Sequence, residues 1–509
     1  MALEPTVGAL TEAVSGRRWA PEEVVREVAR RVHRLERRGL APGERVFIHF
    51  GNRLEFFAEL LAVWHLGGCA VPIDGRLTAF ELETLARTAA PRFALVDDAT
   101  APEVARTLGA AGATVVDTAD VAADAGPLPA GRRRLDDEAL ILFTSGSTGS
   151  PKGVVHTHRS LGARWITLRQ ALGLEVFERT LCLLPTHFGH GLICNCLFPW
   201  LAGRELCVTP PFRPELIMRL GALLDEHRIT FMSSVPSLWR LALKAARPPR
   251  AATLRRVHCG SAPLSAALWE GIRTWTGTED VLNAYGITET GSWVAGTTGG
   301  PVVPEDGLVG EPWGAVIRIR RSADTAAPLA GEADCAPGEA GYVWLSTPAL
   351  MKGYLDRDDL TRQVVADGWF MTGDIGLLDE RGRLHLRGRE RDEINKGGMK
   401  IYPADVDAVV ERFEGTTDVC TFGLDDALYG QNVALAVVLA DDRDATIRGL
   451  HDWMRRHLAE HKMPVRWYVL GEIPRTSRGK VNRDDVKNAC AALTPLDLGR
   501  ILARAGAAS

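Results

Sequence analysis

Short apolar runs alternate with helical stretches along most of the chain, and this alternation limits the fold more than any other feature of the sequence. Each run is bounded by turn-forming residues, which is typical of a buried strand. Strands that alternate with helices predict an α/β architecture with parallel sheets. The predicted strands lie at 45–50, 93–96, 113–116, 181–184, 229–232 and 256–259.

Two stretches near the N-terminus predict helices. The first lies between Pro21, a residue suited to the first turn of a helix, and Gly39. Its apolar stripe has helical spacing, at Val24, Val25, Val28, Val32 and Leu35. The second helix is predicted over 54–66. The arginines of 26–38 and 132–134 are expected on solvated faces of the molecule.

The chain of 509 residues is long enough for two or more domains. From about Gly341 the predicted strands pair as hairpins, for example over 376–386, where a Glu-Arg-Gly turn separates two short runs. After Asp392 the pattern becomes that of a compact α+β segment. We therefore expect a large domain over 1–390 and a small domain over 391–509.

The composition excludes several classes of protein. A net charge of −4 and an isoelectric point of about 6.4 argue against a general nucleic-acid-binding protein. No apolar run reaches the roughly 18 residues of a membrane span, and the N-terminus has no signal-peptide pattern. The nine cysteines are scattered, so we expect reduced thiols and a cytoplasmic location. The close pairs at 194–196 and 156–158 lack the second pair that a zinc site needs.

The segment 142–153 is rich in glycine, serine and threonine and contains Lys152. Glycines let backbone N–H groups turn toward an anion, hydroxyls add donors, and a lysine supplies a cation for oxygens beyond their reach. The segment therefore predicts a loop that binds a polyphosphate, with a plain flexible turn as the alternative. Its spacing differs from the phosphate loop of kinase-like NTPases, because no serine or threonine follows Lys152.

Further motifs follow this loop in order, at 283–289, 368–374, 387–389, 396–403 and 474–480. Their order and spacing resemble the core motifs of the adenylate-forming superfamily, which includes acyl- and aryl-CoA synthetases, adenylation domains of peptide synthetases and luciferases. The resemblance runs from about Arg45 to about Arg483. It implies an α/β N-terminal domain of several subdomains with a distorted β-barrel, followed by a small mobile α+β domain that hinges near Arg391.

The resemblance also implies which residues bind ATP and Mg²⁺. The β- and γ-phosphates would be cradled by Thr144, Ser145, Gly146, Ser147, Thr148, Gly149 and Lys152. The adenine slot would be formed by Gly260, Ser261, Ala262, Pro263, Asn283, Ala284, Tyr285 and Gly286. Thr288 would bind the α-phosphate, and Glu289 would hold the Mg²⁺ that bridges phosphate oxygens. Asp374 and Arg389 would hold the ribose.

Lys480 matches the lysine that contacts both the attacking carboxylate and the α-phosphate. Because Lys480 and Lys152 fall in different predicted domains, the reaction would require the small domain to close over the large one. Family members then rotate the small domain for thioester formation. In that arrangement Gly397 and Gly398 would line the tunnel for the pantetheine arm of CoA.

The acid-binding pocket is predicted less sharply than the nucleotide site. Its candidate residues are His187, Phe188, His190, Ser234 and Trp239, with Asn195 and Trp200 nearby, and a core role is the alternative for each. Gly189 lies where amino-acid-activating members have an aspartate, which argues against an α-amino acid substrate. Asn395 stands where many relatives have a lysine that acts in the second half-reaction.

We therefore expect an acid–thiol ligase that uses ATP, Mg²⁺ and CoA and releases AMP and pyrophosphate. One alternative is an enzyme that loads a carrier protein in trans, and another, suggested by Asn395, is an enzyme of one half-reaction. A luciferase-like second step has no specific support. A nucleotide sensor without turnover is disfavoured by Lys152, Glu289, Asp374 and Lys480. The composition is compatible with a bulky acid of secondary metabolism.

Overall fold

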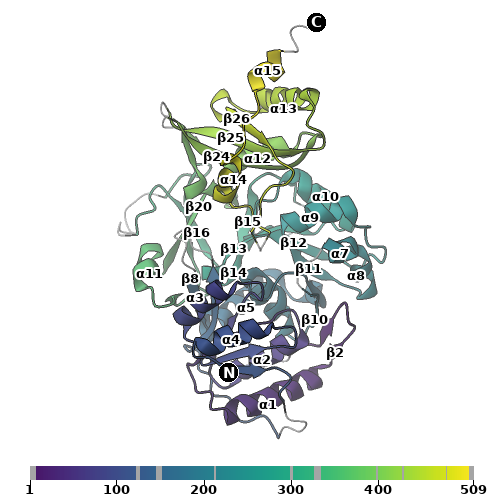
Figure 1. The fold of residues 1–509 in the computed structure, drawn as a ribbon, viewed down its shortest axis with the longest axis vertical. Helices are drawn as coiled ribbons and strands as arrows, with labels where there is room; N and C mark the ends of the chain where they lie inside the picture. The colour runs from purple at the N-terminus through teal and green to yellow at the C-terminus, as the bar shows by residue number, and fades with distance from the viewer. Residues whose placement is uncertain are drawn as a thin grey trace.

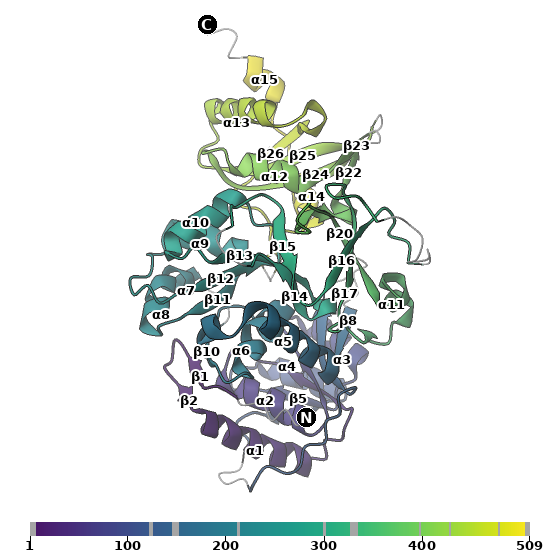
Figure 2. The same cartoon turned by 180° about the vertical axis from the view of Figure 1, so that it is seen from behind.

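The computed structural model describes residues 7–121, 126–144, 152–210, 214–298, 302–325, 334–396, 399–426, 429–476 and 479–503. Figure 1 shows a large body that carries the N-terminus and a smaller unit, yellow-green to yellow, that carries the C-terminus. Figure 2 shows the same arrangement from behind. The predicted site residues Ser145, Gly146, Ser147, Thr148, Gly149, Gly397 and Gly398 lie outside the described residues.

A seven-stranded sheet forms one part of the large body. Its order is β18 (Gly353–Tyr354), β8 (Lys152–Thr157), β7 (Glu138–Thr144), β4 (Cys69–Pro72), β3 (Arg45–Ile48), β5 (Phe93–Val96) and β6 (Thr114–Asp117). The strands from β7 to β6 run parallel, while β8 and β18 are antiparallel to their neighbours. The strands predicted at 45–50, 93–96 and 113–116 are confirmed.

A second sheet of 14 strands crosses the rest of the large body. Its parallel half contains β13 (Val281–Ile287), β12 (Arg256–Gly260), β11 (Phe231–Ser234), β9 (Arg179–Cys182), β10 (Glu205–Val208) and β1 (Leu10–Glu12). Its edge strand β2 (Arg18–Trp19) pairs antiparallel with β1. Two predicted strands are displaced by two residues: β9 begins earlier than the predicted 181–184, and β11 begins later than the predicted 229–232.

Antiparallel strands continue this sheet beyond β13, beginning with β14 (Ser292–Gly296). The family resemblance implies a distorted β-barrel in the large domain. The further strands are β15 (Leu308–Pro312), β21 (Leu384–Arg389), β20 (Trp369–Leu378), β17 (Gly341–Ser346) and β16 (Val316–Arg320), with β19 (Val365–Ala366) paired to β20. The hairpin predicted at 376–386 is formed by β20 and β21.

Helices pack against both sheets. They are α1 (Pro21–Arg37), α2 (Leu54–His65), α3 (Ala79–Ala89), α4 (Pro102–Ala110), α5 (His158–Leu172), α6 (Phe198–Trp200), α7 (Pro214–Met218), α8 (Leu220–Glu226), α9 (Pro236–Ala245), α10 (Ala266–Thr276) and α11 (Asp358–Val364). One apolar core joins α1, α2 and α5 to strands of both sheets. Both predicted helices near the N-terminus, α1 and α2, are confirmed.

The small unit is built on a sheet of its own. The strands are β23 (Met399–Ile401), β22 (Ile394–Lys396), β25 (Gly430–Leu439), β24 (Thr416–Asp426) and β26 (Arg466–Val469). The helices are α12 (Pro403–Glu411), α13 (Asp444–His457), α14 (Arg483–Ala491) and α15 (Leu498–Ala503). The large sheet thus ends at Arg389 and the small sheet begins at Ile394.

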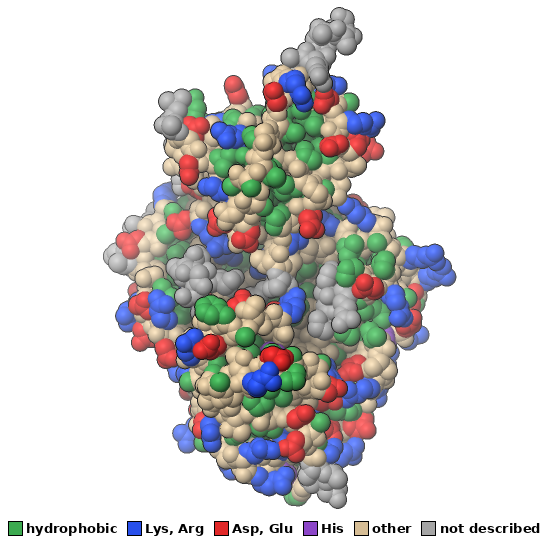
Figure 3. All heavy atoms as spheres, viewed as in Figure 1, with side chains coloured by type: hydrophobic (Ala, Val, Ile, Leu, Met, Phe, Trp, Pro, Cys, Tyr) green, Lys and Arg blue, Asp and Glu red, His purple; other side chains and the backbone are tan. Residues whose placement is uncertain are grey.

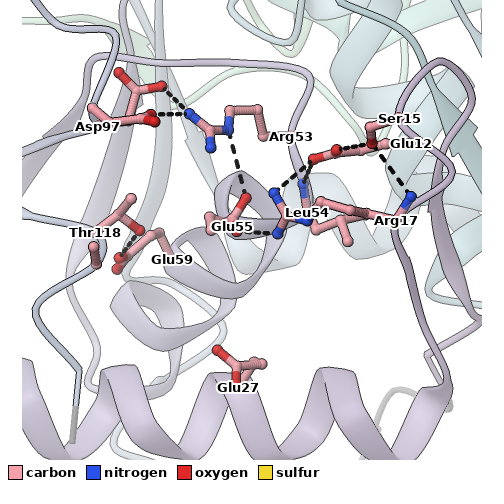
Figure 4. A network of polar contacts seen from close by, with 12 residues as sticks. Glu12, Ser15, Arg17, Glu27, Arg53, Leu54, Glu55, Glu59, Asp97 and Thr118 are labelled. Atoms are coloured by element: carbon pink, nitrogen blue, oxygen red, sulfur yellow. Dashed lines mark hydrogen bonds and ion pairs between the residues drawn. The ribbon is translucent and has the colours of Figure 1, made fainter.

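The prediction that the arginines of 26–38 lie on a solvated face is wrong for two of them. Arg31 and Arg34 are each only 2% exposed and pair with the fully buried Glu59 of α2. Arg34 donates to both Glu59 oxygens, at 2.7 and 2.6 Å, and the Thr118 hydroxyl adds a bond at 2.8 Å. Figure 4 shows the bond between Glu59 and Thr118. Helical spacing alone does not reveal a buried carboxylate on the neighbouring helix.

Acidic and basic side chains are interspersed over the face shown in Figure 3, in keeping with the small net charge. Among the helices that the structure describes, none has the length and apolar character needed to cross a membrane.

Candidate active site

Lys480, a residue of the small unit, contacts the large unit. The Lys480 ammonium nitrogen lies 5.4 Å from the ring centroid of Phe188, which belongs to the large unit. At the neighbouring Gly479 the backbone is left-handed, with φ of 74°, and an added Cβ would lie 2.9 Å from the Ser237 hydroxyl oxygen. A glycine at this position therefore lets the loop approach α9 closely.

The Lys480 loop is tied to the small unit at both of its ends. Thr476 donates its backbone N–H to the Lys480 carbonyl at 2.8 Å, and Arg475 pairs with Asp418 at 2.6 Å. Beyond the loop, Arg483 opens α14 and pairs with the half-buried Asp407 at 2.5 Å. These bonds hold the position of Lys480 relative to the small sheet.

Thr144 and Lys152 stand opposite each other in the β7–β8 pair, at the two ends of the predicted phosphate loop. The Thr144 hydroxyl donates to the Lys152 carbonyl at 3.5 Å. The Lys152 ammonium nitrogen is 5.4 Å from the ring centroid of Tyr354, a residue of β18. Both ends of the loop are thus fixed by the seven-stranded sheet.

Thr288 and Glu289 lie in a short 3₁₀ helix, Thr288–Thr290, which directly follows β13. His156 donates through Nε2 to the Thr288 carbonyl at 2.8 Å, and Arg164 donates to the Thr290 carbonyl at 2.9 Å. Burial lowers the pKa of His156 to about 4 and that of Arg164 to about 10. The imidazole is therefore neutral near pH 7, and the turn is held from behind by two buried side chains.

The Glu289 carboxylate is held from a different direction. Tyr354 donates its hydroxyl to Glu289 Oε1 at 2.8 Å, and the Met351 backbone N–H donates to the Glu289 carbonyl at 2.7 Å. Tyr354, His156 and Arg164 are not among the site residues that the sequence predicts. The histidine pair at 156–158 is the one sequence feature that includes any of them, and its spacing argues against a zinc site.

Asp374 and Arg389 face each other across the β20–β21 pair. Arg389 Nε lies 2.7 Å from Asp374 Oδ1, and the Tyr285 hydroxyl donates to Asp374 Oδ2. Burial, followed by the negative charge of Asp374, raises the pKa of Tyr285 well above its usual range. Two residues predicted for the ribose and one predicted for the adenine slot are therefore in direct contact.

The adenine-slot residues converge where β12 ends beside the middle of β13, because Gly260 pairs with Ala284. An added Cβ at Gly260 would lie 2.1 Å from the Ala284 carbonyl oxygen, so only glycine fits there. Ser261 has a left-handed φ of 66°, and Asn283 donates to the Leu308 carbonyl at 2.6 Å. The carboxyl ends of parallel strands are the usual edge for ligands in α/β sheets.

Part of the predicted acid pocket lies beside Lys480. His190 is 5% exposed, and its nitrogens lie 2.6 Å from the Ser233 hydroxyl and 2.8 Å from that of Ser261. Burial, then the positive charge of Lys480, lowers the pKa of His190 to about 3. An added Cβ at Gly189 would lie 3.5 Å from the Thr288 hydroxyl oxygen. Lys480, His190 and the Thr288 turn thus surround one small region.

The remaining pocket candidates are engaged elsewhere. His187 pairs with Asp74 at 3.3 Å. Burial by itself would raise the pKa of Asp74, but hydrogen bonds from His187 and Arg76 hold that pKa below its usual range. Trp239 donates to the Ser234 hydroxyl oxygen at 2.7 Å. The Ser234 hydroxyl in turn donates to a backbone carbonyl. Asn195 and Trp200 also bond backbone carbonyls. The side chains of Ser234, Trp239, Asn195 and Trp200 are fully buried, and that of His187 is not.

Arg391 lies in the 3₁₀ turn Glu390–Asp392 between the large and small sheets. Asn395 follows in β22 and donates its backbone N–H to the Gln431 side chain at 2.8 Å. Two ion pairs join the large and small units, one between Arg240 and Glu411 and one between Arg412 and Asp306.

The donor chemistry at Glu289 fits Mg²⁺, which prefers oxygen ligands and usually draws them from one or two carboxylates, substrate phosphates and water. Within the described ranges, no group of three or more His, Cys, Asp or Glu residues could by itself hold a metal ion. A Mg²⁺ at Glu289 would therefore share its shell with the nucleotide.

Comparisons with known proteins agree with this geometry. The family model for AMP-binding enzymes matches residues 5–355, and the model for their C-terminal domain matches residues 405–480. A feruloyl-CoA synthase of Amycolatopsis sp is 30% identical over 91% of this chain and 92% of its own. The fatty acid–[acyl-carrier-protein] ligase ScoC of Streptomyces coeruleorubidus is 31% identical over 95% of this chain and 94% of its own.

The fold agrees as well. A crystal structure of ATP-bound MatB from Rhodopseudomonas palustris matches with a TM-score of 0.84 and 28% identity, covering 96% of this chain and 97% of that one. The chain therefore belongs to the AMP-binding enzymes, as an acid–thiol ligase of the acyl- and aryl-CoA synthetase family within the adenylate-forming superfamily.

Proposed function

We propose that Lys480, Thr288, Asp374 and Arg389 carry out adenylation at the seam between two domains, 1–390 and 391–509. One observation carries this proposal: Lys480, which belongs to the small sheet's unit, reaches Phe188 of the large unit. A lysine placed over the site from a second domain can be withdrawn by rotation about Arg391. Such a rotation would clear the same site for CoA.

In the first half-reaction, the acid carboxylate attacks the α-phosphorus of ATP and pyrophosphate leaves. Two anions must be brought together, so positive charge has to be concentrated between them. Lys480 would bind the carboxylate and the α-phosphate, with Thr288 as a hydrogen-bond donor to the latter. Lys152 would bind the outer phosphates. Asp374, held in place by Arg389 and Tyr285, would fix the ribose hydroxyls.

Glu289 would hold Mg²⁺, which neutralises charge on the phosphate oxygens when it is bound. His156 and Arg164 orient the Thr288–Thr290 turn through its carbonyls, so that the Thr288 hydroxyl and the Glu289 carboxylate keep a fixed direction.

In the second half-reaction, the CoA sulfur attacks the acyl carbon of the adenylate, the thioester bond forms, and the bond to AMP breaks. The thiol proton leaves to solvent. We place the pantetheine arm beside 397–398, next to β22 and β23 of the small domain, where Asn395 replaces the lysine found in many relatives.

The acid-binding region favours an acid without an α-ammonium group. Gly189 offers no carboxylate for such a group, and an added Cβ there would meet the side chains of Leu142 and Thr288. The rings of Phe188 and Trp293 lie close to that of the neutral His190, with centroids 6.1 and 5.8 Å away. One relative is named as a feruloyl-CoA synthase and another as a fatty acid ligase. We therefore propose aryl and fatty acids as the substrate classes to test first.

A carrier protein in trans is a second candidate acceptor, because ScoC is named as a ligase of an acyl-carrier protein and is 31% identical to this chain. We also propose a cytoplasmic location, where ATP and CoA are both supplied.

The test is pyrophosphate release with Mg·ATP across aryl, fatty and polycyclic acids, with and without CoA, with products identified by mass spectrometry. We expect pyrophosphate, AMP and an acyl-CoA. An adenylate that accumulates despite saturating CoA would support the carrier-protein acceptor or a single half-reaction. Nucleotide binding without pyrophosphate release from any acid would contradict the proposal.

A further inference from the structure

The segment that runs from Met351 to Tyr354 connects the two anion-handling parts of the site, and no motif of the sequence analysis includes it. β18 pairs antiparallel with β8, the strand that begins at Lys152, and places Tyr354 opposite Val154. Backbone bonds on either side, from Lys352 to the Val155 carbonyl at 2.8 Å and from Leu355 to the Gly153 carbonyl at 2.7 Å, fix this register.

The Tyr354 side chain makes one contact through its hydroxyl and another through its ring. Its hydroxyl donates to Glu289 Oε1 at 2.8 Å, and its ring lies 5.4 Å from the Lys152 ammonium nitrogen. An ammonium group at this distance is attracted by the negative face of an aromatic ring. One side chain thus bridges the predicted Mg²⁺ carboxylate and the predicted phosphate lysine.

Tyr354 is itself rigidly held. It is 7% exposed and packs with Val154, Met351 and Phe370 in a small apolar cluster. Its backbone N–H donates to the Thr361 hydroxyl at 2.9 Å. A phenolic hydroxyl carries its proton near neutral pH, so Tyr354 is the donor of its bond to Glu289.

We propose that Tyr354 is a positioning residue that orients the Glu289 carboxylate for Mg²⁺ and steadies the Lys152 ammonium group for the outer phosphates of ATP. The inference rests on the proposed function, because it assigns Glu289 to the metal and Lys152 to the phosphates. By accepting the hydroxyl bond, Oε1 fixes the plane of the carboxylate, and Oε2 would remain available to a metal ion. The bond from the Met351 backbone to the Glu289 carbonyl holds the same residue from its main chain.

The test measures metal binding separately from turnover. Mn²⁺ serves as the probe, and free Mn²⁺ is counted by electron paramagnetic resonance in the presence of α,β-methylene-ATP, which adenylation cannot cleave. In Tyr354→Phe, which keeps the ring, we expect Mn²⁺ to bind about tenfold more weakly, as for loss of a hydrogen bond to a charged group. Binding of the analogue in EDTA should be unchanged.

Tyr354→Leu removes the ring as well. We expect it to weaken metal-free binding of the ATP analogue severalfold while AMP binding stays the same, because AMP lacks the phosphates that Lys152 would reach. The matched control is Tyr468→Phe, a tyrosine that is 5% exposed in the small domain and stacks on Phe422. It should behave as the unsubstituted enzyme in every binding assay.

Glu289→Gln distinguishes failure of the Tyr354 role from failure of the Glu289 metal assignment. If Glu289→Gln abolishes Mn²⁺ binding but Tyr354→Phe binds Mn²⁺ as tightly as the unsubstituted enzyme, the positioning role of Tyr354 is wrong and the site assignment stands. If Glu289→Gln also binds Mn²⁺ normally, the assignment of Glu289 to the metal is wrong, and the role of Tyr354 falls with it.

Discussion

Arg240 of α9 forms an ion pair with Glu411 at the end of α12, so a side chain of the large domain is joined to one of the small domain. Both side chains are mostly buried, with exposures of 24% and 18%. The adjacent Arg412 pairs with Asp306, which also accepts the backbone N–H of Ala266 at the start of α10. These contacts lie on the same seam as Lys480 and stabilise the arrangement in which Lys480 reaches Phe188.

Reversing one charge of the Arg240–Glu411 pair should therefore disfavour this arrangement. We expect Arg240→Glu to slow adenylation about fivefold, corresponding to about 1 kcal/mol for a partly exposed ion pair. Thioester formation from a supplied acyl-adenylate should not slow, because in the proposed mechanism it uses the rotated arrangement. Rapid-quench assays of the two half-reactions measure both rates.

The control is the exchanged pair, Arg240→Glu combined with Glu411→Arg, which should regain most of the adenylation rate. If the double variant is as slow as the product of the two single effects, the ion pair does not stabilise the adenylating arrangement.

Removal of the Lys480 ammonium group should affect one half-reaction only. We expect Lys480→Ala to slow adenylation by about 10² to 10³, the loss typical of a group that stabilises charge developing in the transition state. Thioester formation from a pre-made adenylate should remain close to normal. Pyrophosphate release and thioester yield, measured separately, check this, and an equal loss in both would contradict the division of labour between domains.

Much of the fold could be predicted because strand and helix periods are local properties of the sequence. The strands at 45–50 and 93–96 and the helices α1 and α2 were recovered from their apolar spacing. Displacements of two residues at β9 and β11 arise because adjacent apolar residues on either side of a buried strand fit its pattern equally well. The burial of Arg31 and Arg34 could not be foreseen, since it depends on Glu59 of another helix.

The candidate site could be predicted where a motif is contiguous. Asp374 and Arg389 were identified from separate motifs, and the β20–β21 register brings them together. Tyr354, His156 and Arg164 were missed because each acts through a partner more than 60 residues away, at Glu289, Thr288 and Thr290. Such pairings depend on strand order, which spacing along the chain does not contain.

The buried cluster at Glu59 gives a stability prediction. Glu59→Gln removes the carboxylate that pairs with the buried Arg34, while Arg31 keeps its ion pair with Glu27. Breaking a buried ion pair by removing one partner typically costs about 3 to 5 kcal/mol. We expect the thermal midpoint to fall by several degrees, as measured by calorimetry. Glu103→Gln is the matched control, because Glu103 forms an exposed pair with Arg106 on α4, and it should leave the midpoint unchanged.

His190 should make the enzyme less stable in acid. Its pKa is lowered to about 3 in the folded protein, from an ordinary value of 6.5, because of burial and the charge of Lys480. Between these two values the unfolded chain binds a proton at this position that the folded chain does not. Stability therefore decreases as pH falls below 6.5, by about 1.4 kcal/mol for each pH unit from this residue alone.

His190→Gln should remove that contribution, because an amide can bond the hydroxyls of Ser233 and Ser261 but does not titrate. We expect the thermal midpoint of the unsubstituted enzyme to fall more steeply between pH 6.5 and 4.5 than that of His190→Gln, with the two curves nearly parallel above pH 7. Burial also lowers the pKa of four other histidines, His49, His156, His158 and His258. They are present in both proteins, so their contributions largely cancel in the difference. Parallel curves across the whole range would mean that the folded protein protonates His190 as readily as the unfolded chain, and that Lys480 does not bring its charge close to this imidazole.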